Sequence, residues 1–224
     1  MIATTAVVPA APAIAAQSIV PGFNLTNQLD VSAFVPDPTD FIFLAGTTNF
    51  IGIGKCGSIA LGHMPGGVLQ NTTWSGISWP SQGQVTCAPG DRGLLGIGLD
   101  PGTTTVYLTY DYTPGAGTLC LDGSTTQDGL VYGRITKLTM DSATAPQTFS
   151  DEQPMIDCLP SFSADHPGSA DDSHTIGTVL VAPDHTIFAG TGEASSYNFP
   201  DASALGAQDI HSPRGKIFHI NPDG

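Results

Sequence analysis

A short structural unit recurs along this chain. An apolar strand runs into a turn that contains Pro or Asp, and in most copies a second strand rich in β-branched and aromatic residues follows. Recurrence of such a unit is typical of repeat architectures such as the β-propeller, whose blades take about 40–50 residues each. We therefore expect an all-β fold of antiparallel blades. The copies lie at residues 31–37 with 41–44, 94–101 with 106–110, 179–184 with 186–189, and 216–223.

Composition supports an all-β fold and excludes some classes of partner. The 224 residues include 27 Gly and 18 Pro, which interrupt every stretch that could form a long amphipathic helix. The formal net charge is −14, from 20 acidic and 6 basic residues, and would repel a phosphate backbone. No apolar run approaches the length of a membrane span. We expect neither nucleic acid nor a membrane as a partner.

The chain is expected to divide into a leader, residues 1–18, and one domain, residues 19–224. The leader is rich in Ala, and Ala13-Ile14-Ala15 resembles a signal-peptidase site, although no basic residue precedes it. It is therefore either a partial signal peptide or a disordered Ala/Pro leader. Within the domain we expect strands in 19–62, 84–112 and 130–140, and loops at 63–83, 113–129 and 141–173.

The apolar positions of the expected strands predict the interfaces between blades. Together they would form a core of the size that a chain of this length can bury. They are Leu94, Leu95, Ile97, Val106, Leu108, Val179, Val181, Ile187, Phe188, Ile217 and Ile220.

Four cysteines lie far apart and form no C-x-x-C pair, which argues against a zinc or thioredoxin-like site. An even, dispersed set indicates disulfides in an oxidising compartment. Of the three pairings we favour Cys56–Cys87 with Cys120–Cys158, because each would tie down a loop that leaves a strand. Buried free thiols are the alternative.

Two blocks of sequence carry a family resemblance. The first is Asp91-Arg92-Gly93-Leu94-Leu95-Gly96 with the strand that follows, and the second runs from Ser173-His174-Thr175-Ile176-Gly177 to Asn221-Pro222-Asp223-Gly224. In order and spacing they resemble the glucose/sorbosone dehydrogenase family of quinoprotein β-propellers, over roughly residues 20 to 224. The resemblance implies a six-bladed β-propeller of the quinoprotein glucose dehydrogenase type. About half of it would be present here, as part of a longer protein.

The resemblance also implies a site that uses pyrroloquinoline quinone (PQQ) and calcium. His174 would be the general base, and the calcium site would lie outside this chain, with no metal site within it. Asp91 or Arg92 stands where some members have a cofactor-binding Gln, and Thr178 stands where they have an Arg. Glu193 follows a Gly-Thr-Gly sequence where members have an acidic residue, so it would line the channel. Asp171 or Asp172 would replace the carboxylate that precedes the histidine in relatives, since that place is Ser173 here, and Asp172 and Glu193 would contact the substrate.

Two classes of function follow from the resemblance. The first is PQQ-dependent oxidation of an aldose or related sugar by a secreted or periplasmic protein. The second is a non-catalytic β-propeller that binds carbohydrate or protein. The expected ligand is a small sugar, and an incomplete propeller would expose strand edges through which it could associate.

Overall fold

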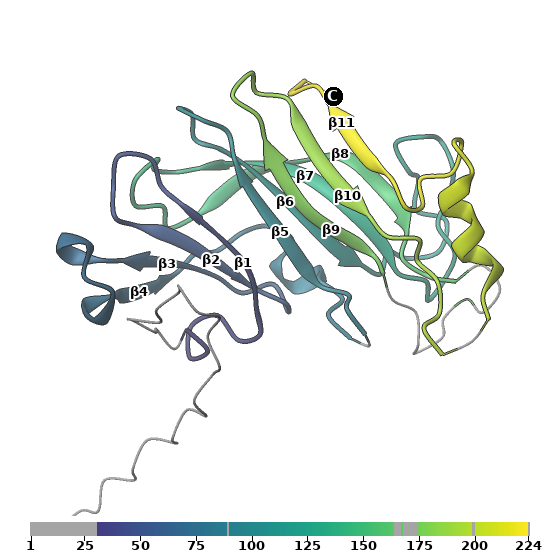
Figure 1. The fold of residues 1–224 in the computed structure, drawn as a ribbon, viewed down its shortest axis with the longest axis horizontal. Coiled ribbons are helices and arrows are strands. Elements are labelled where there is room, and N and C mark those ends of the chain that lie inside the picture. The colour runs from purple at the N-terminus through teal and green to yellow at the C-terminus, as the bar shows by residue number, and fades with distance from the viewer. Residues whose placement is uncertain (1–30, 89, 164–166, 168–173, 199, 224) are drawn as a thin grey trace, which may run out of the picture.

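The computed structural model describes residues 31–88, 90–163, 167, 174–198 and 200–223. Within them, antiparallel strands form three separate sheets, which lie one beside the next (Figure 1). Two sheets have four strands, ordered β1-β2-β3-β4 and β5-β6-β7-β8, and the third has the order β11-β10-β9. The fold is therefore all-β, and within each sheet consecutive strands lie side by side, as in the blades of a propeller. No described helix is long and apolar enough to span a membrane.

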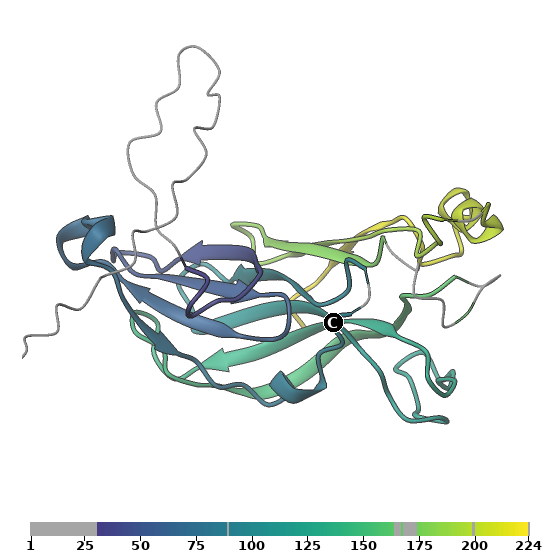
Figure 2. The ribbon, with the colours of Figure 1, turned by 90° about the horizontal axis from the view of Figure 1, so that it is seen from below.

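Each sheet is a meander of consecutive strands, and short 3₁₀ turns lie in the connections. Figure 2 shows the longest such turn, η4, at the end of the molecule farthest from β1–β4. The strands are β1 Pro38–Phe43, β2 Phe50–Gly54, β3 Ile59–His63, β4 Thr73–Gly76, β5 Leu94–Leu99, β6 Thr105–Tyr112, β7 Tyr132–Met140, β8 Phe149–Pro160, β9 Ile176–Val181, β10 Ile187–Thr191 and β11 Ile217–Ile220. The turns are η1 Pro65–Gly67, η2 Leu69–Asn71, η3 Gln82–Gln84 and η4 Ala202–Gln208.

The first strands of the three sheets, β1, β5 and β9, are neighbours. Thr39 Oγ1 donates a hydrogen bond to the carbonyl of Leu94 at 2.7 Å, which joins β1 to β5. A Cβ on Gly96 would lie 2.8 Å from Thr178 Cα, so only glycine allows β5 to approach β9 this closely. Farther along, Gly98 faces Val181, so β5 and β9 run in the same direction. We call β1, β5 and β9 the inner strands, and all three begin at the same end of the fold.

The predicted interface positions are mostly confirmed. Two clusters of buried apolar residues join the first sheet to the second and the second to the third. Leu95 and Val181 are partly buried against the second cluster. The predictions for Phe188 and Ile217 are wrong, since these side chains are 39% and 79% exposed. They point to the face of the third sheet that is turned away from the second. The remaining positions, all buried, are Leu94, Ile97, Val106, Leu108, Val179, Ile187 and Ile220.

Both predicted disulfides are confirmed. Cys56–Cys87 ties the β2–β3 turn to the loop that follows η3, with Cα atoms 4.9 Å apart. Cys120–Cys158 ties the 113–129 insertion to β8, with Cα atoms 5.9 Å apart.

Three of the expected boundaries are wrong. Residues 31–37 form turns rather than a strand, because the Val35 amide donates back to the Val31 carbonyl and Asp37 has φ of 48°. The expected loop 63–83 contains β4, and the expected loop 141–173 contains β8. The sequence of β8 indicates a loop because it contains two prolines and several acidic residues. The structure accommodates them because β8 is the outer strand of its sheet and pairs with β7 through register shifts. The expected leader, residues 1–18, lies outside the described residues.

Candidate functional site

His174 and Glu193 meet on two paired segments at the start of the inner strands. His174 precedes β9 and Glu193 follows β10. The Gly192 amide donates to the Thr175 carbonyl at 2.7 Å, and the Ala194 amide donates to the His174 carbonyl at 3.0 Å. A Cβ on Gly192 would lie 2.0 Å from that His174 carbonyl oxygen, so the pairing requires glycine there.

The imidazole of His174 is hydrogen-bonded through Nδ1 to Oε1 of Glu193. Partial burial acts to raise the pKa of Glu193, but hydrogen bonds from His174, its own backbone and Ser195 outweigh it and lower that pKa. Since the carboxylate is then ionised and can only accept, Nδ1 carries a proton in this contact, and in the neutral form of the imidazole Nε2 carries the lone pair. The His174 side chain is 51% exposed. The pair therefore presents a basic nitrogen that a ligand can reach.

A second carboxylate fixes the backbone of His174. Asp91 Oδ2 accepts a hydrogen bond from the His174 amide at 2.8 Å, although the two residues are 83 positions apart. His174 has φ of 55°, in the left-handed region that few non-glycine residues adopt. The contact with Asp91 brings the segment before β5 to the base and holds this unusual conformation.

A buried carboxylate lies beneath the pair. Asp111 on β6 is fully buried and accepts hydrogen bonds from Ser161 Oγ at 2.5 Å, Thr175 Oγ1 at 2.9 Å and the Gly93 amide at 3.1 Å. Burial raises the pKa of Asp111 to about 7, against the lowering effect of these hydrogen bonds and of Arg92. Asp111 thus joins the segments that carry Asp91 and His174.

The other predicted site residues are placed differently. Arg92 is buried and donates through Nε at 3.1 Å to the Ser161 carbonyl, so it lies behind the site. Thr178 lies on β9 and donates at 3.5 Å to Asp40 on β1, which also accepts from the Ile97 amide at 3.3 Å. The structure thus brings His174, Glu193 and Asp91 together but not Arg92 or Thr178. Asp172 lies outside the described residues.

Sequence reasoning missed Asp111, Asp40 and Arg214. One signal was available for Asp111, because it is the only charged residue within an apolar and aromatic strand. A carboxylate in such a strand is either exposed on one face or buried with partners. Asp40 and Arg214 stand in turn-rich sequence and give no comparable signal.

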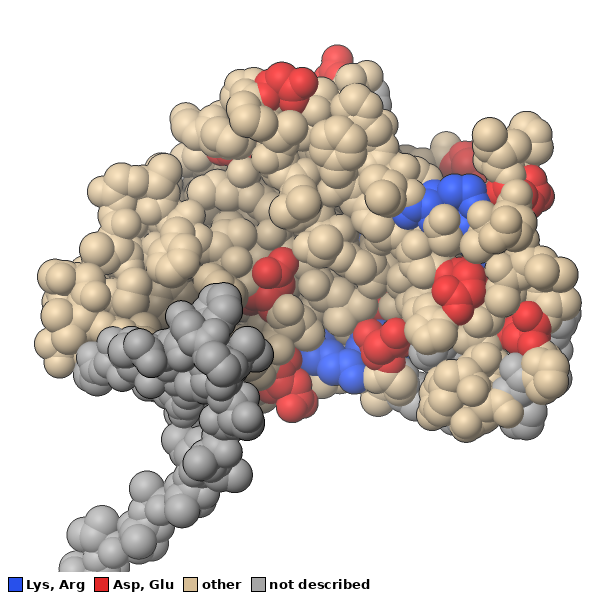
Figure 3. All heavy atoms as spheres, in the orientation of Figure 1, with Lys and Arg blue, Asp and Glu red and all other residues tan. Residues whose placement is uncertain are grey.

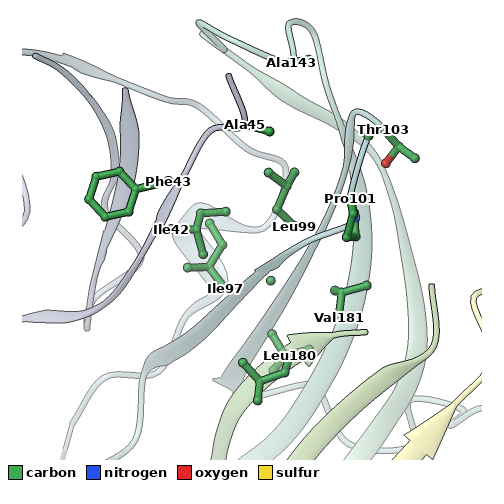
Figure 4. Close-up of a pocket in the computed structure, with 13 residues that line it drawn as sticks. Ile42, Phe43, Ala45, Ile97, Leu99, Pro101, Thr103, Ala143, Leu180 and Val181 are labelled. Atoms are coloured by element: carbon green, nitrogen blue, oxygen red, sulfur yellow. The ribbon is translucent and has the colours of Figure 1, made fainter. Parts of the chain in front are cut away.

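A groove lies at the opposite end of the inner strands. It has a volume of about 530 Å³, and Ile42, Leu99 and Val181 are among its mostly apolar lining residues (Figure 4). These residues come from the last parts of β1, β5 and β9, whereas His174 and Asp91 precede the first residues of β9 and β5. The groove offers few polar groups to orient a sugar. The candidate site is therefore the His174–Glu193 pair.

The cationic side chains of the chain all have structural partners. Figure 3 shows a face on which basic side chains gather at two spots, with acidic ones scattered among uncharged ones. Arg134 stacks on Tyr112 at 4.1 Å and pairs with Asp157. The other five basic residues donate to backbone carbonyls: Lys55, Arg92, Lys137, Arg214 and Lys216.

A model of the glucose/sorbosone dehydrogenase family matches residues 55–224. The chain belongs to this family. The match includes His174, Glu193 and Asp91 and confirms the resemblance drawn from the sequence. No curated protein sequence matches the chain.

Solved structures agree on the fold. A glucose dehydrogenase shares 16% identity with a TM-score of 0.61, over 84% of this chain and 45% of that one. A second glucose dehydrogenase shares 14% identity with a TM-score of 0.59, over 85% and 46%. A putative oxidoreductase (glucose dehydrogenase) from Thermus thermophilus shares 20% identity with a TM-score of 0.51, over 79% and 41%. The chain therefore spans less than half the length of each of these structures.

The cofactor that the family resemblance implies fits this chain only in part. A basic imidazole held by a carboxylate suits the removal of a hydroxyl proton. The carboxylates of PQQ would call for cationic partners, and all six basic residues are engaged elsewhere. Among the described residues, no three His, Cys, Asp or Glu side chains gather as a metal site. The residues present therefore do not fit PQQ or calcium as a complete binding site.

Proposed function

We propose that this chain contributes the general base to a sugar dehydrogenase. The observation that carries the proposal is the hydrogen bond from His174 Nδ1 to the ionised Glu193, which in the neutral imidazole leaves Nε2 as the basic nitrogen of a side chain that is 51% exposed. Membership of the glucose/sorbosone dehydrogenase family makes an aldose or a related sugar the proposed substrate. Because the chain spans less than half of the matched structures, the activity is proposed for a complete propeller that contains it.

The proposed step of this chain is a proton transfer. Nε2 of His174 takes the proton of the sugar hydroxyl as the C–H bond at the same carbon breaks. The resulting imidazolium is stabilised by Glu193, which keeps its own negative charge. Asp91 and the Gly192–Thr175 pairing hold the ring in place during the transfer. This role of Glu193 differs from the channel-lining role expected from sequence alone.

The cofactors remain part of the proposal. PQQ, when bound, would supply the acceptor for the hydride that leaves the sugar, and calcium would be the second cofactor. The basic residues and oxygen ligands for both would come from parts of the propeller outside this chain. We derive no role for Thr178 or Arg92 in binding PQQ, because their side chains contact Asp40 and the Ser161 carbonyl.

Location and partners are proposed on two further features. The two disulfides support a secreted or periplasmic location, which fractionation of the native host would check. Phe41 and Phe43 on β1 are each 59% exposed, and support association through the open edge of the propeller. If the protein sediments as a monomer at every concentration tested, this association is contradicted.

The test compares two histidines in the full-length protein. His185 is a matched control, since its Nδ1 contacts Asp100 at 2.6 Å and its side chain is 49% exposed, at the opposite end of β9. With PQQ, calcium and an artificial electron acceptor, His174→Gln should lower kcat by about 10² to 10⁴, because glutamine cannot act as a base. His185→Gln should leave kcat within about twofold of that of the unmodified protein.

Two outcomes would overturn the proposal. Unchanged turnover in His174→Gln would remove this residue from the reaction. A protein that binds sugar in calorimetry but oxidises none would instead be a non-catalytic propeller, the second class of function that the sequence suggested.

A further inference from the structure

Arg214 lies in the loop before β11 and extends into the back of the candidate site. Its side chain is buried, and Nη1 donates to the carbonyls of Glu193 at 2.8 Å and Ala194 at 2.7 Å. Nη2 donates to the carbonyl of Phe162 at 2.8 Å. One guanidinium group therefore joins the segment after β10 to the segment after β8.

The two carbonyls held by Nη1 belong to the turn that orients the Glu193 side chain. Ala194 has φ of 52°, a left-handed conformation that is unfavourable for an L-residue with a Cβ. Its amide donates to the His174 carbonyl, so this turn and the histidine are directly connected. A donor that binds both carbonyls at once stabilises the turn and fixes the direction in which Glu193 leaves it.

The surrounding backbone is shaped to receive Arg214. A Cβ on Gly206, in η4, would lie 2.8 Å from Arg214 Cδ, so the absence of a side chain there makes room for the arginine. The Gly215 amide donates to the Gly192 carbonyl at 2.9 Å and anchors the arginine loop beside the glutamate. Two parts of the connection between β10 and β11 thus place this guanidinium group.

We propose that Arg214 is a positioning residue for the general base. It fixes the backbone at Glu193 so that the carboxylate meets Nδ1 of His174 and keeps the proton on that nitrogen. The inference rests on the proposed function only for its effect on turnover, since the effect on the imidazole can be measured without a substrate. A lysine is a poor replacement, because its ammonium donates from one nitrogen, whereas the planar guanidinium of Arg214 directs Nη1 to the Glu193 and Ala194 carbonyls and Nη2 to the Phe162 carbonyl.

The experiment follows the tautomer of His174 by ¹⁵N NMR in the intact protein. With Arg214 in place, Nδ1 carries the proton and Nε2 gives the signal of an unprotonated imidazole nitrogen. In Arg214→Lys the contact with Glu193 loosens, and a signal of protonated Nε2 should appear. In the sugar oxidation assay kcat should fall by up to about 10²-fold with KM changed less than about twofold, because the base is misplaced while binding is retained.

Arg134→Lys is the matched control. Arg134 is also largely buried and contacts Tyr110, Tyr112 and Asp157, away from the base. Its replacement should lower the urea midpoint without changing the His174 signals or kcat. A second variant, Gly206→Ala, displaces the Arg214 side chain without changing its charge and should shift the His174 signals in the same direction as Arg214→Lys.

The outcomes separate the two proposals. If Arg214→Lys only lowers the urea midpoint, and the His174 signals and kcat stay as in the unmodified protein, the positioning role is overturned. If Arg214→Lys does not fold, unchanged His174 signals in Gly206→Ala overturn it equally. If the signals shift but the unmodified protein oxidises no sugar, the positioning role is supported and the proposed function fails.

Discussion

Replacing Asp111 by Asn should change how the stability of this protein depends on pH. Burial raises the pKa of Asp111 from 3.8 to about 7 in the folded protein. Between these values the unfolded chain has released the proton and the folded protein still holds it. The unfolded state therefore binds fewer protons, and the free energy of unfolding falls as pH rises through this window. Above about pH 7 this contribution becomes constant.

The size of the effect follows from the shift. A difference of about three pKa units corresponds to roughly 4 kcal/mol between pH 4 and pH 8. Asparagine has the shape of the protonated acid. Its oxygen can accept from Thr175 and from the Gly93 amide, while its amide group donates to Ser161 Oγ. The variant should therefore fold and should lack the loss of stability that Asp111 causes.

Urea unfolding of both proteins between pH 4 and pH 8 measures the effect. The free energy of unfolding of the unmodified protein, minus that of Asp111→Asn, should fall by about 4 kcal/mol across the range. Groups that titrate alike in both proteins cancel in this difference. Asp122→Asn, at a fully exposed turn, is the control for the loss of one charge. Parallel profiles would refute the reasoning, and a difference that rises with pH would show that the three donors keep Asp111 ionised.

Two further predictions concern the covalent and backbone framework. The unreduced, unfolded protein should titrate no free thiol, and reduction should cost about 2–5 kcal/mol of stability per disulfide in urea unfolding; a titration that finds four thiols would contradict the pairing. Gly192→Ala should cost about 1–3 kcal/mol or more and weaken the His174–Glu193 contact, because its Cβ would clash with the His174 carbonyl. Gly190→Ala, where a Cβ meets nothing within 4 Å, should change stability by no more than about 0.5 kcal/mol. Equal stabilities of these two variants would count against the close pairing.

The parts of the fold that the sequence predicted are those with strong local signals. Strands β5, β6, β9 and β10 carry apolar or β-branched residues, and glycine or Pro-Asp turns follow β5 and β9. Strand β8 lacks this pattern, because its conformation comes from pairing with β7 along one edge while much of its surface stays exposed. Pairing of this kind depends on the neighbouring strand rather than on the segment itself.

The sequence predicted individual residues of the candidate site but not the contacts among them. His174, Glu193 and Asp91 were each expected from the family resemblance, yet nothing local shows that one carboxylate binds the ring and the other the backbone amide. The carboxylate expected beside the base was Asp171 or Asp172, and both lie outside the described residues. Glu193, 19 positions after the histidine, also supplies a carboxylate to the ring. Arg92 or Asp91 was expected at the cofactor because one of them stands where some family members have a Gln. In the structure Arg92 is buried and donates to the Ser161 carbonyl.

The position of the base depends on packing between two sheets. Asp91 and Asp111 belong to the second sheet and its leading segment, whereas His174 and Glu193 flank strands of the third. The hydrogen bonds that Asp91 and Asp111 accept from the 174–175 segment therefore cross the interface where β5 packs closely on β9. A propeller builds such interfaces between every pair of neighbouring blades, so residues far apart in sequence can meet at the start of the inner strands. This arrangement lets a short histidine segment, with few local constraints of its own, hold a left-handed conformation and keep Nδ1 against Glu193.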